Sequence, residues 1–171
     1  DIAYLGHDSG LKCDLDAIDN LYYEVGMRRA VDRRMAVAVL ERVGVAGVMR
    51  QAVRQMSAGQ KRRVAFARVL LCATPLWILD EPASNLDVAG QALVGTLLDE
   101  HLAAGGIAVV ATHHALHLHA GTLQALQLVT SEVFGRFSAR RHACRVQLFI
   151  RSRVGVELRR ARLAGVPLHG G

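Results

Sequence analysis

The sequence predicts an α/β fold built on a parallel β-sheet. Two short apolar runs, at residues 76–79 and 107–111, each lead into polar side chains, and a segment with a helical pattern lies between them. A strand, a helix and a second strand in this order form a βαβ unit, whose strands lie parallel in one sheet. Buried parallel strands are typically continuous apolar runs of this kind. We therefore expect the chemistry at the carboxyl edge of the sheet.

The composition is that of an ordinary globular domain. Of the 171 residues, 51% are hydrophobic and 21% are charged, which excludes a disordered or collagen-like chain. The longest uncharged apolar stretch, residues 69–79, is much shorter than the roughly 20 residues that a transmembrane helix needs. Cys13, Cys72 and Cys144 are far apart, so they indicate neither a disulfide framework nor a zinc site. A reducing cytosol fits this cysteine usage.

Two helices are predicted ahead of the first apolar run. Residues 14–25 carry acids first and apolar residues later, which suits a helix with acids near its positive end. Residues 31–43 repeat the apolar spacing of a helix, and Gly44 is placed to end it. The opening residues 1–11 are assigned no element.

Two longer helices are expected around the first apolar run. The string S-A-G-Q at residues 57–60 has the pattern of a capping box, in which Ser57 accepts from a first-turn amide and Gln60 answers it. A helix over residues 58–72 follows this box. A second helix, over residues 88–103, joins the two apolar runs and is stopped by a pair of glycines.

The end of the chain has weaker signals and most of the positive charge. Residues 144–148 alternate like a strand and residues 156–164 resemble an Arg-rich helix, but neither pattern is strong enough to assign. Residues 131–171 hold nine arginines against two glutamates, whereas the rest of the chain is nearly neutral. Three interpretations stay open for this basic tail: a segment beside anionic lipid, an arm for nucleic acid, or a segment with no selected function.

Acidic residues follow the first apolar run directly. Asp80 and Glu81 stand side by side at its end, Asp87 comes seven residues after Asp80, and the second run leads to His113. One carboxylate can hold Mg²⁺ while its neighbour polarises a water molecule, which is an arrangement for nucleotide hydrolysis. An isolated acidic pair more often begins a solvated loop. The convergence of polar groups on one sheet edge favours a site.

Four strings carry a family resemblance. They are M-S-A-G-Q-K-R-R at residues 56–63, L-W-I-L-D-E-P at 76–82, S-N-L-D at 84–87 and A-T-H at 111–113. In order and spacing they resemble the signature motif, Walker B strand, D-loop and switch histidine of the nucleotide-binding domain of ABC transporters. Within that family, Y-L-G-H at residues 4–7, G-L-K at 10–12 and L-W-I-L-D-E-P at 76–82 are most similar to the ATP-binding subunits of bacterial haem exporters of cytochrome c maturation.

The resemblance implies a particular organisation. The fold would be a P-loop NTPase-like parallel sheet with an ABC-type helical subdomain. Residues 1–13 would form the Q-loop region, residues 14–74 the helical subdomain with the signature motif, and residues 75–125 the core with Walker B, D-loop and switch histidine. Residues 126–171 would be an Arg-rich tail of unknown status.

The resemblance also assigns residues to ATP and Mg²⁺. The signature residues would face the γ-phosphate of an ATP molecule held by a second subunit, because unsatisfied amides at a helix amino terminus favour an anion. Asp80 would bind Mg²⁺ through water, Glu81 would polarise the attacking water, and His113 would contact the γ-phosphate. Asp87 would help to couple the two halves of the dimer. The signature residues are Ser57, Ala58, Gly59 and Gln60.

Two departures from the family pattern stand out. The Q-loop glutamine, which in the family reaches Mg²⁺ and the membrane partner, should follow Gly6-His7, but position 8 is Asp8. Its carboxylate could still bind Mg²⁺, although a charge near the γ-phosphate is less favourable than an amide. Nothing matches the phosphate loop G-x-x-x-x-G-K-[ST], and neither Lys12 nor Lys61 has that context. The family places this loop before the Q-loop, so we expect a sequence truncated at its amino end that has no ATPase activity by itself.

The function that the resemblance implies is that of an ABC-type ATPase subunit. It would pair with a second nucleotide-binding subunit and with integral membrane subunits, peripherally at the cytoplasmic face of the bacterial inner membrane, and it would export haem or drive a haem-linked step of cytochrome c maturation. No nucleic-acid partner is expected, and the basic residues 61–63 are expected on a solvated helix face. The alternatives are a non-catalytic remnant and a soluble ABC-type ATPase acting on nucleic acid.

Overall fold

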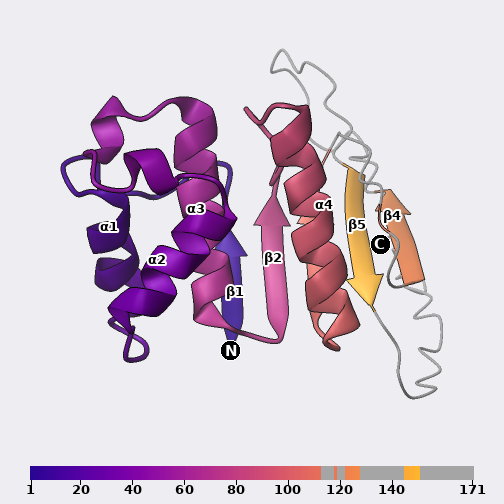
Figure 1. The fold of residues 1–171 in the computed structure, drawn as a ribbon. Coiled ribbons are helices and arrows are strands. Elements are labelled where there is room, and N and C mark those ends of the chain that lie inside the picture. Colours follow the sequence, from indigo (N-terminus) through magenta and orange to yellow (C-terminus); the bar gives the residue numbers. More distant parts are fainter. Residues whose placement is uncertain (113–117, 119–121, 128–144, 151–171) are drawn as a thin grey trace, which may run out of the picture.

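The computed structural model describes residues 1–112, 118, 122–127 and 145–150 (Figure 1). Along the chain its elements are β1 (Ile2–Leu5), α1 (Ala17–Val25), α2 (Arg33–Arg42), the 3-10 turns η1 (Ala46–Val48) and η2 (Val53–Gln55), α3 (Ala58–Cys72), β2 (Leu76–Asp80), α4 (Val88–Ala103), β3 (Ile107–Ala111), β4 (Thr122–Gln127) and β5 (Arg145–Ile150).

One sheet organises the described elements, with its strands in the order β1-β2-β3-β5-β4. β1, β2 and β3 are parallel, and β5 is antiparallel to both of its neighbours. In register, Leu5 stands opposite Leu79, and Asp80 stands opposite Ala111. The three parallel strands therefore end at one edge, and β2, α4 and β3 form the βαβ unit that the sequence predicts.

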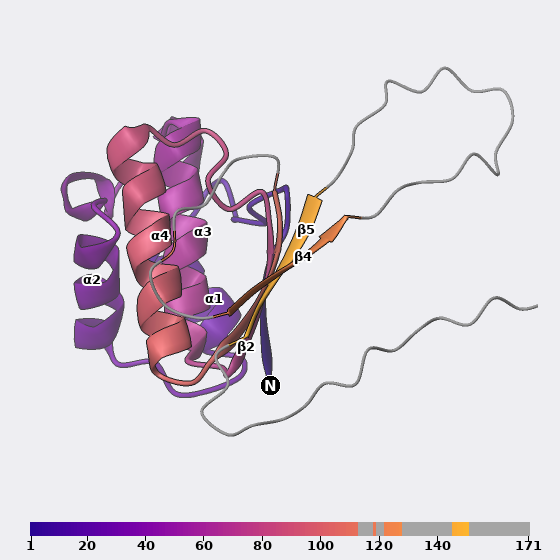
Figure 2. The ribbon, with the colours of Figure 1, turned by 90° about the vertical axis from the view of Figure 1, so that its right-hand side faces the viewer.

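The described helices cover one face of the sheet (Figure 2). Side chains alternate between the two faces of a strand, so Trp77 and Leu79 of β2 are buried against the helices. α3 packs on β1, and α4 packs on β3. On the other face the side chains of Ile2, Tyr4 and Ile107 are exposed. The layer of helices and the edge of the sheet together define where polar groups can gather.

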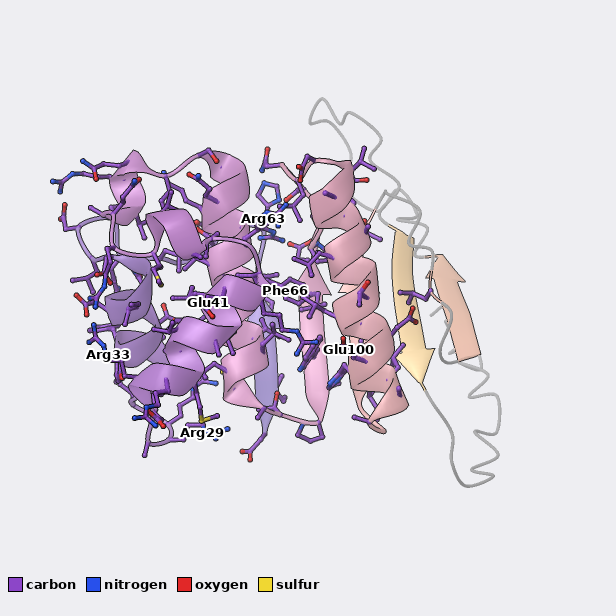
Figure 3. The ribbon with its side chains drawn as sticks, viewed as in Figure 1. Arg29, Arg33, Glu41, Arg63, Phe66 and Glu100 are labelled. Atoms are coloured by element: carbon purple, nitrogen blue, oxygen red, sulfur yellow. The ribbon has the colours of Figure 1, made fainter. Side chains whose placement is uncertain are left out.

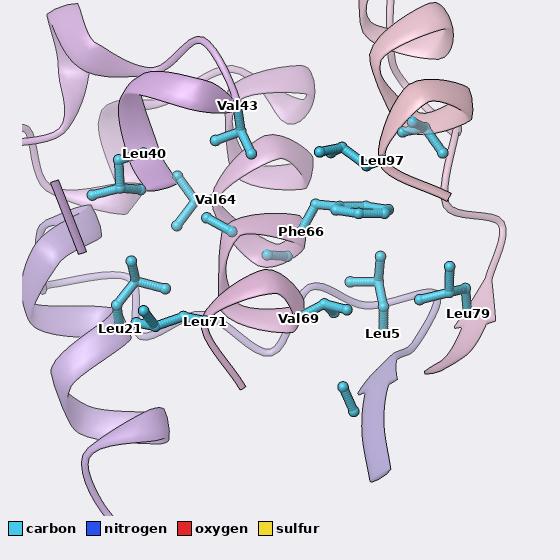
Figure 4. Packing of buried hydrophobic residues seen from close by; sticks show 14 of the residues in the cluster. Leu5, Leu21, Leu40, Val43, Val64, Phe66, Val69, Leu71, Leu79 and Leu97 are labelled. Atoms are coloured by element: carbon cyan, nitrogen blue, oxygen red, sulfur yellow. The ribbon is translucent and has the colours of Figure 1, made fainter. Parts of the chain in front are cut away.

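The hydrophobic core fills the space between α3, α4 and the sheet (Figure 4). The ring of Phe66 lies edge-on to the Trp77 ring, with centroids 5.9 Å apart. A second part of the core lies between α3 and the pair α1 and α2. Fully or nearly fully buried members include Leu5, Leu21, Leu40, Val64, Phe66, Val69, Leu79 and Leu97.

The first helix is shorter than the predicted helix over residues 14–25. It begins at Ala17, because Asp16 has extended backbone and its side chain accepts a hydrogen bond from the amide of Asp19. Asp14 lies outside the helix and forms an ion pair with Arg54. The acids at this terminus thus act as a cap and a tether rather than as a first helical turn.

The second helix also begins later than the prediction over residues 31–43. Asp32 caps it by accepting from the amide of Arg34, so helical backbone begins at Arg33. At the other end Gly44 adopts a φ of 77°, in the left-handed region that glycine tolerates. The predicted stop at Gly44 is confirmed.

The predictions for the two longer helices are confirmed in both position and length. α3 begins after Ser57 with the complete capping box, in which Ser57 Oγ accepts from the Gln60 amide and Gln60 Oε1 accepts from the Ser57 amide. α4 begins after Asp87, whose side chain accepts from the Gly90 amide. Local capping chemistry therefore fixes both helix starts.

Neither β1 nor β4 is predicted from the sequence. β1 has four residues, only two of which point into the core, so its alternation is too short to separate from a loop. The alternating residues after Cys144 belong to β5. The predicted site residue His113 lies outside the described residues, as does the basic tail over residues 131–171 apart from residues 145–150.

A stacked pair of rings closes the core at the amino end of the parallel strands. The imidazole of His101, on α4, lies 3.8 Å from the Trp77 ring at an interplanar angle of 9°. Its Nε2 lies 3.2 Å from the carbonyl oxygen of Ile107. Burial lowers the pKa of His101, and its contacts with the backbone at Ile107 and Pro75 oppose that shift. Burial therefore favours the neutral form of the ring.

We expect the stability of the fold to fall with acidification through His101. Its pKa is lower in the folded than in the unfolded chain, so the unfolded chain binds the proton more readily and unfolding is favoured as pH falls below about 6.5. His101→Phe retains a ring on Trp77 but cannot take up a proton. Thermal unfolding followed by circular dichroism from about pH 7 to about pH 5 should show a steeper loss for the natural protein than for this variant. Parallel curves would contradict the interpretation.

Candidate nucleotide-hydrolysis site

The acidic pair lies at the carboxyl end of β2. Asp80 is the last residue of the strand. Like Leu76 and Ile78, it lies on the face of β2 that the described helices leave uncovered. Glu81 begins the following turn, where its amide donates to the carbonyl oxygen of Ala111 at 2.7 Å. The two neighbouring carboxylates therefore leave the strand in different directions.

The backbone of Glu81 is held in an unusual conformation. Its φ is 48°, a left-handed value that a residue with a side chain adopts at a cost of about 1–3 kcal/mol. The Ser84 amide donates to its carbonyl oxygen at 2.9 Å, which closes the turn. Its carboxylate accepts from the hydroxyl of the buried Thr112 at 3.2 Å. The turn and Thr112 together fix the direction of this carboxylate.

The signature residues form the amino terminus of α3, at the same edge of the sheet. Ser57 and Ala58 are exposed, while Gly59 and Gln60 are half-buried. The side chains of Ser57 and Gln60 are used in the capping box, so the amino terminus presents backbone amides rather than these side chains. A terminus of this kind favours an anion.

Gly59 lies against the loop that follows the acidic pair. A Cβ atom at Gly59 would lie 2.8 Å from the carbonyl oxygen of Asn85, and Asn85 itself has a left-handed φ of 60°. The close approach needs a residue without a side chain. The predicted signature motif and the predicted D-loop are thus in direct backbone contact within one chain.

Arg62 is the residue that joins these parts, and the sequence-based prediction for it is wrong. Residues 61–63 were expected on a solvated helix face, but the Arg62 side chain is buried, with 3% of the residue exposed. Its Nη1 donates to the carbonyl oxygen of Gly6 at 2.7 Å, and its Nη2 donates to those of Asp80 and Glu81, the latter at 2.8 Å. One guanidinium therefore spans the ends of β1 and β2.

The position of Arg62 on α3 explains the error. The buried residues of that helix include Arg62, Ala65, Phe66 and Val69, which recur at the spacing of a single helix face. Burial lowers the pKa of Arg62, while the carboxylates of Asp80 and Glu81 act in the opposite direction. An arginine in phase with an apolar stripe is the sequence signal that would have identified it.

Arg63 makes a second link, between α3 and the start of α4 (Figure 3). Its Nη2 donates to Asp87 Oδ1 at 2.9 Å, and its Nη1 donates to the carbonyl oxygen of Val43 at 3.0 Å. The hydrogen bond from the Gly90 amide holds the pKa of Asp87 below its ordinary value, and the hydrogen bond from Arg63 makes the next largest contribution. Asp87 therefore acts as a helix cap and as an ion-pair partner.

Asp8 lies in the loop after β1. Its carboxylate accepts from the Gly10 amide at 3.3 Å, and Asp8 lines a cavity of about 270 Å³ with Tyr4, Glu24 and Arg68, among others.

Among the described residues, no cluster of three or more His, Cys, Asp or Glu side chains could hold a metal ion. Mg²⁺ usually takes only one or two carboxylates and completes its shell with water and phosphate, so Asp80 remains a fitting ligand.

Comparison with known proteins identifies the family. Residues 1–84 match the sequence profile of the family described as ABC transporter. This segment belongs to the ABC transporter family. Its match includes the β1 loop, the signature helix and the acidic pair, which confirms the resemblance found in the motifs.

The family relatives include proteins described as "Cytochrome c biogenesis ATP-binding export protein CcmA". The chain is 46% identical to the one from Xanthomonas campestris pv. campestris over 114 residues, covering 67% of this chain and 53% of that protein. It is 46% identical to the one from Methylococcus capsulatus over 129 residues, covering 75% of this chain and 62% of that protein. The chain thus spans between half and two thirds of the length of these relatives.

The fold agrees with solved cassettes of the same family. The dimeric structure of a post-hydrolysis state of an ATP-binding cassette bound to ADP and Pi matches at a TM-score of 0.61 with 26% identity, covering 66% of this chain and 52% of that chain. A second dimeric bacterial ABC transporter cassette matches at a TM-score of 0.60. The predicted P-loop NTPase-like α/β fold is confirmed.

The contact at Gly59 yields a stability prediction. In Gly59→Ala the new methyl group meets a backbone oxygen, which cannot rotate away as a side chain can, so we expect a loss of about 1–3 kcal/mol in the free energy of unfolding. Gly47→Ala is the matched control, because nothing lies within 4 Å of its added Cβ, and it should change stability by about 0.5 kcal/mol or less. Chemical denaturation of both variants measures the difference. Equal effects would show that the contact with Asn85 is not tight.

Proposed function

We propose that this chain is part of the ATP-binding and ATP-hydrolysing subunit of an ABC transporter that exports haem or drives a haem-linked step in cytochrome c maturation. The ATPase chemistry is supported by one observation above all: two adjacent carboxylates leave β2 beside the signature helix. The haem-linked role is supported by relatives that are described as cytochrome c biogenesis export proteins.

In this proposal the acidic pair performs the hydrolysis. Asp80 would hold Mg²⁺, which would stabilise charge on the phosphates, and Glu81 would polarise the water that attacks the γ-phosphate. The hydrogen bond from Thr112 keeps the Glu81 carboxylate in one direction while this happens. His113 contacts the γ-phosphate. This assignment rests on the motif A-T-H at residues 111–113, since His113 lies outside the described residues.

The second half of the site comes from another subunit. Ser57, Ala58, Gly59 and Gln60 offer the amino terminus of α3 to the γ-phosphate of an ATP molecule held by the partner, where backbone amides and the helix dipole stabilise the charge. Two dimeric cassettes among the structural neighbours support a paired arrangement. Asp87, fixed by Arg63, couples the two halves through the D-loop.

Membrane subunits complete the assembly in this proposal. No described helix has both the length and the apolar character that crossing a bilayer requires. We place the protein peripherally at the cytoplasmic face of the bacterial inner membrane. Asp8 of the Q-loop and the helical subdomain over residues 14–74 face the membrane subunits, with an aspartate in the place of the usual glutamine.

The proposed role of Glu81 is tested by Glu81→Gln. Because the 171 residues contain no G-x-x-x-x-G-K-[ST] loop, we expect no turnover from this chain alone. The test therefore uses a chimera in which the segment of the Xanthomonas campestris relative that precedes the match is fused to residues 1–171. Loss of a general base should reduce Mg²⁺-dependent phosphate release by about 10²–10⁴-fold, with ATP binding retained. Phosphate release and equilibrium binding of ATP are measured in parallel.

A matched control separates chemistry from a general effect of charge. Glu41→Gln makes the same change at an exposed position on α2 and should leave turnover unchanged. Full turnover in Glu81→Gln would contradict the assignment of Glu81.

The haem-linked role has its own readout in the same variants. The chimera should restore covalent haem in c-type cytochromes to a bacterium that lacks the relative's gene, whereas its Glu81→Gln form should not. An ATP-hydrolysing chimera that restores no cytochrome would retain the ATPase assignment and contradict the haem-linked role.

A further inference from the structure

A single buried side chain connects the two functional ends of this subunit. In the proposed dimer, the signature residues at the start of α3 serve one ATP molecule, while Asp80 and Glu81 of the same chain serve the other. Arg62 lies on α3 two residues after Gln60, the last of the signature residues, and its guanidinium contacts the backbone from which both carboxylates extend. Arg62 therefore connects α3, which carries the signature residues, directly to the backbone of the acidic pair.

We propose that Arg62 is a positioning residue for the Glu81 carboxylate and that it couples the signature helix to the catalytic turn within one subunit. This inference rests on the proposed ATPase function. Arg62 does not contact substrate in the proposal. It acts through the backbone of Asp80 and Glu81.

The hydrogen bonds explain why the position of Arg62 sets the position of Glu81. The Glu81 carbonyl accepts both from Arg62 Nη2 and from the Ser84 amide, so the turn with the left-handed φ is held from two sides. The same guanidinium is fixed on its other side by Gly6, at 2.7 Å. A shift of α3 must therefore either break these bonds or move the turn.

The chemistry of the side chain limits what can replace it. A guanidinium is planar and presents two terminal nitrogens at a fixed spacing, which here donate to the ends of two different strands. A lysine retains the charge but offers one nitrogen, which cannot span both ends. Arg62→Lys therefore removes the link while preserving the sign of the charge near Asp80 and Glu81.

The test needs a dimer in which only one Glu81 works. Two copies of the chimera are joined by a flexible linker, and one copy carries Glu81→Gln. Arg62→Lys is then placed either in the copy with the working Glu81 or in the other copy. Steady-state phosphate release gives kcat and the KM for ATP in each case.

The expected result is asymmetric. In the copy with the working Glu81, Arg62→Lys should lower kcat by about tenfold or more with little change in KM, because a misdirected catalytic group slows chemistry rather than binding. The control is Arg68→Lys, since Arg68 lies on the same helix but pairs with Glu24. In the other copy, Arg62→Lys should lower kcat no more than Arg68→Lys does.

Two failures are distinguishable. If the reference dimer with one working Glu81 shows no Mg²⁺-dependent turnover, the ATPase proposal fails. If the reference dimer turns over but Arg62→Lys has equal effects in both copies, Arg62 only supports the fold and the positioning role is overturned. Thermal unfolding of each dimer confirms that the compared species are folded at the assay temperature.

Discussion

The arrangement of α3, β1, β2 and the acidic turn depends on the hydrogen bonds that the Arg62 guanidinium donates. A buried charge is costly unless it is hydrogen-bonded, and here carbonyl oxygens at the ends of β1 and β2 accept from its two terminal nitrogens, while its Nε is buried without a hydrogen-bond partner in the described part of the chain. Asp80 and Glu81 also favour its charged form electrostatically. The helix, the two strands and the acidic turn thus meet around one cation, and the geometry of the edge follows from it.

In the described part of the chain, the residues of the proposed site gather at one edge of the sheet. The described helices cover one face of the sheet and fill the space beneath them with apolar side chains (Figures 2 and 4). Polar groups that close helices and turns, such as Ser57 and Asp87, gather where the parallel strands end. Capping, ion pairing and the close contact at Gly59 then hold α3, the acidic turn and α4 as one unit.

The sequence predicts the local features well and the long-range ones poorly. Capping boxes and apolar runs depend on neighbouring residues, so the bounds of α3 and α4 and the place of the acidic pair were predicted correctly. The strand β1 was missed because its four residues are defined by pairing with β2, far along the chain. Arg62 was assigned to solvent because its carbonyl partners lie 18 to 56 residues away in sequence. The contact between Gly59 and Asn85 belongs to the same long-range class.

In the proposed dimer, the acidic pair of one subunit and the signature helix of another act on the same ATP molecule. A structure of the chimera dimer, trapped with Mg²⁺ and ATP by Glu81→Gln, measures this directly. We expect the Asp80 carboxylate within one water molecule of Mg²⁺ and the α3 amino terminus of the opposite subunit against the γ-phosphate. An ATP molecule contacted by Asp80 but not by the opposite Ser57–Gln60 segment, or by neither, would contradict it.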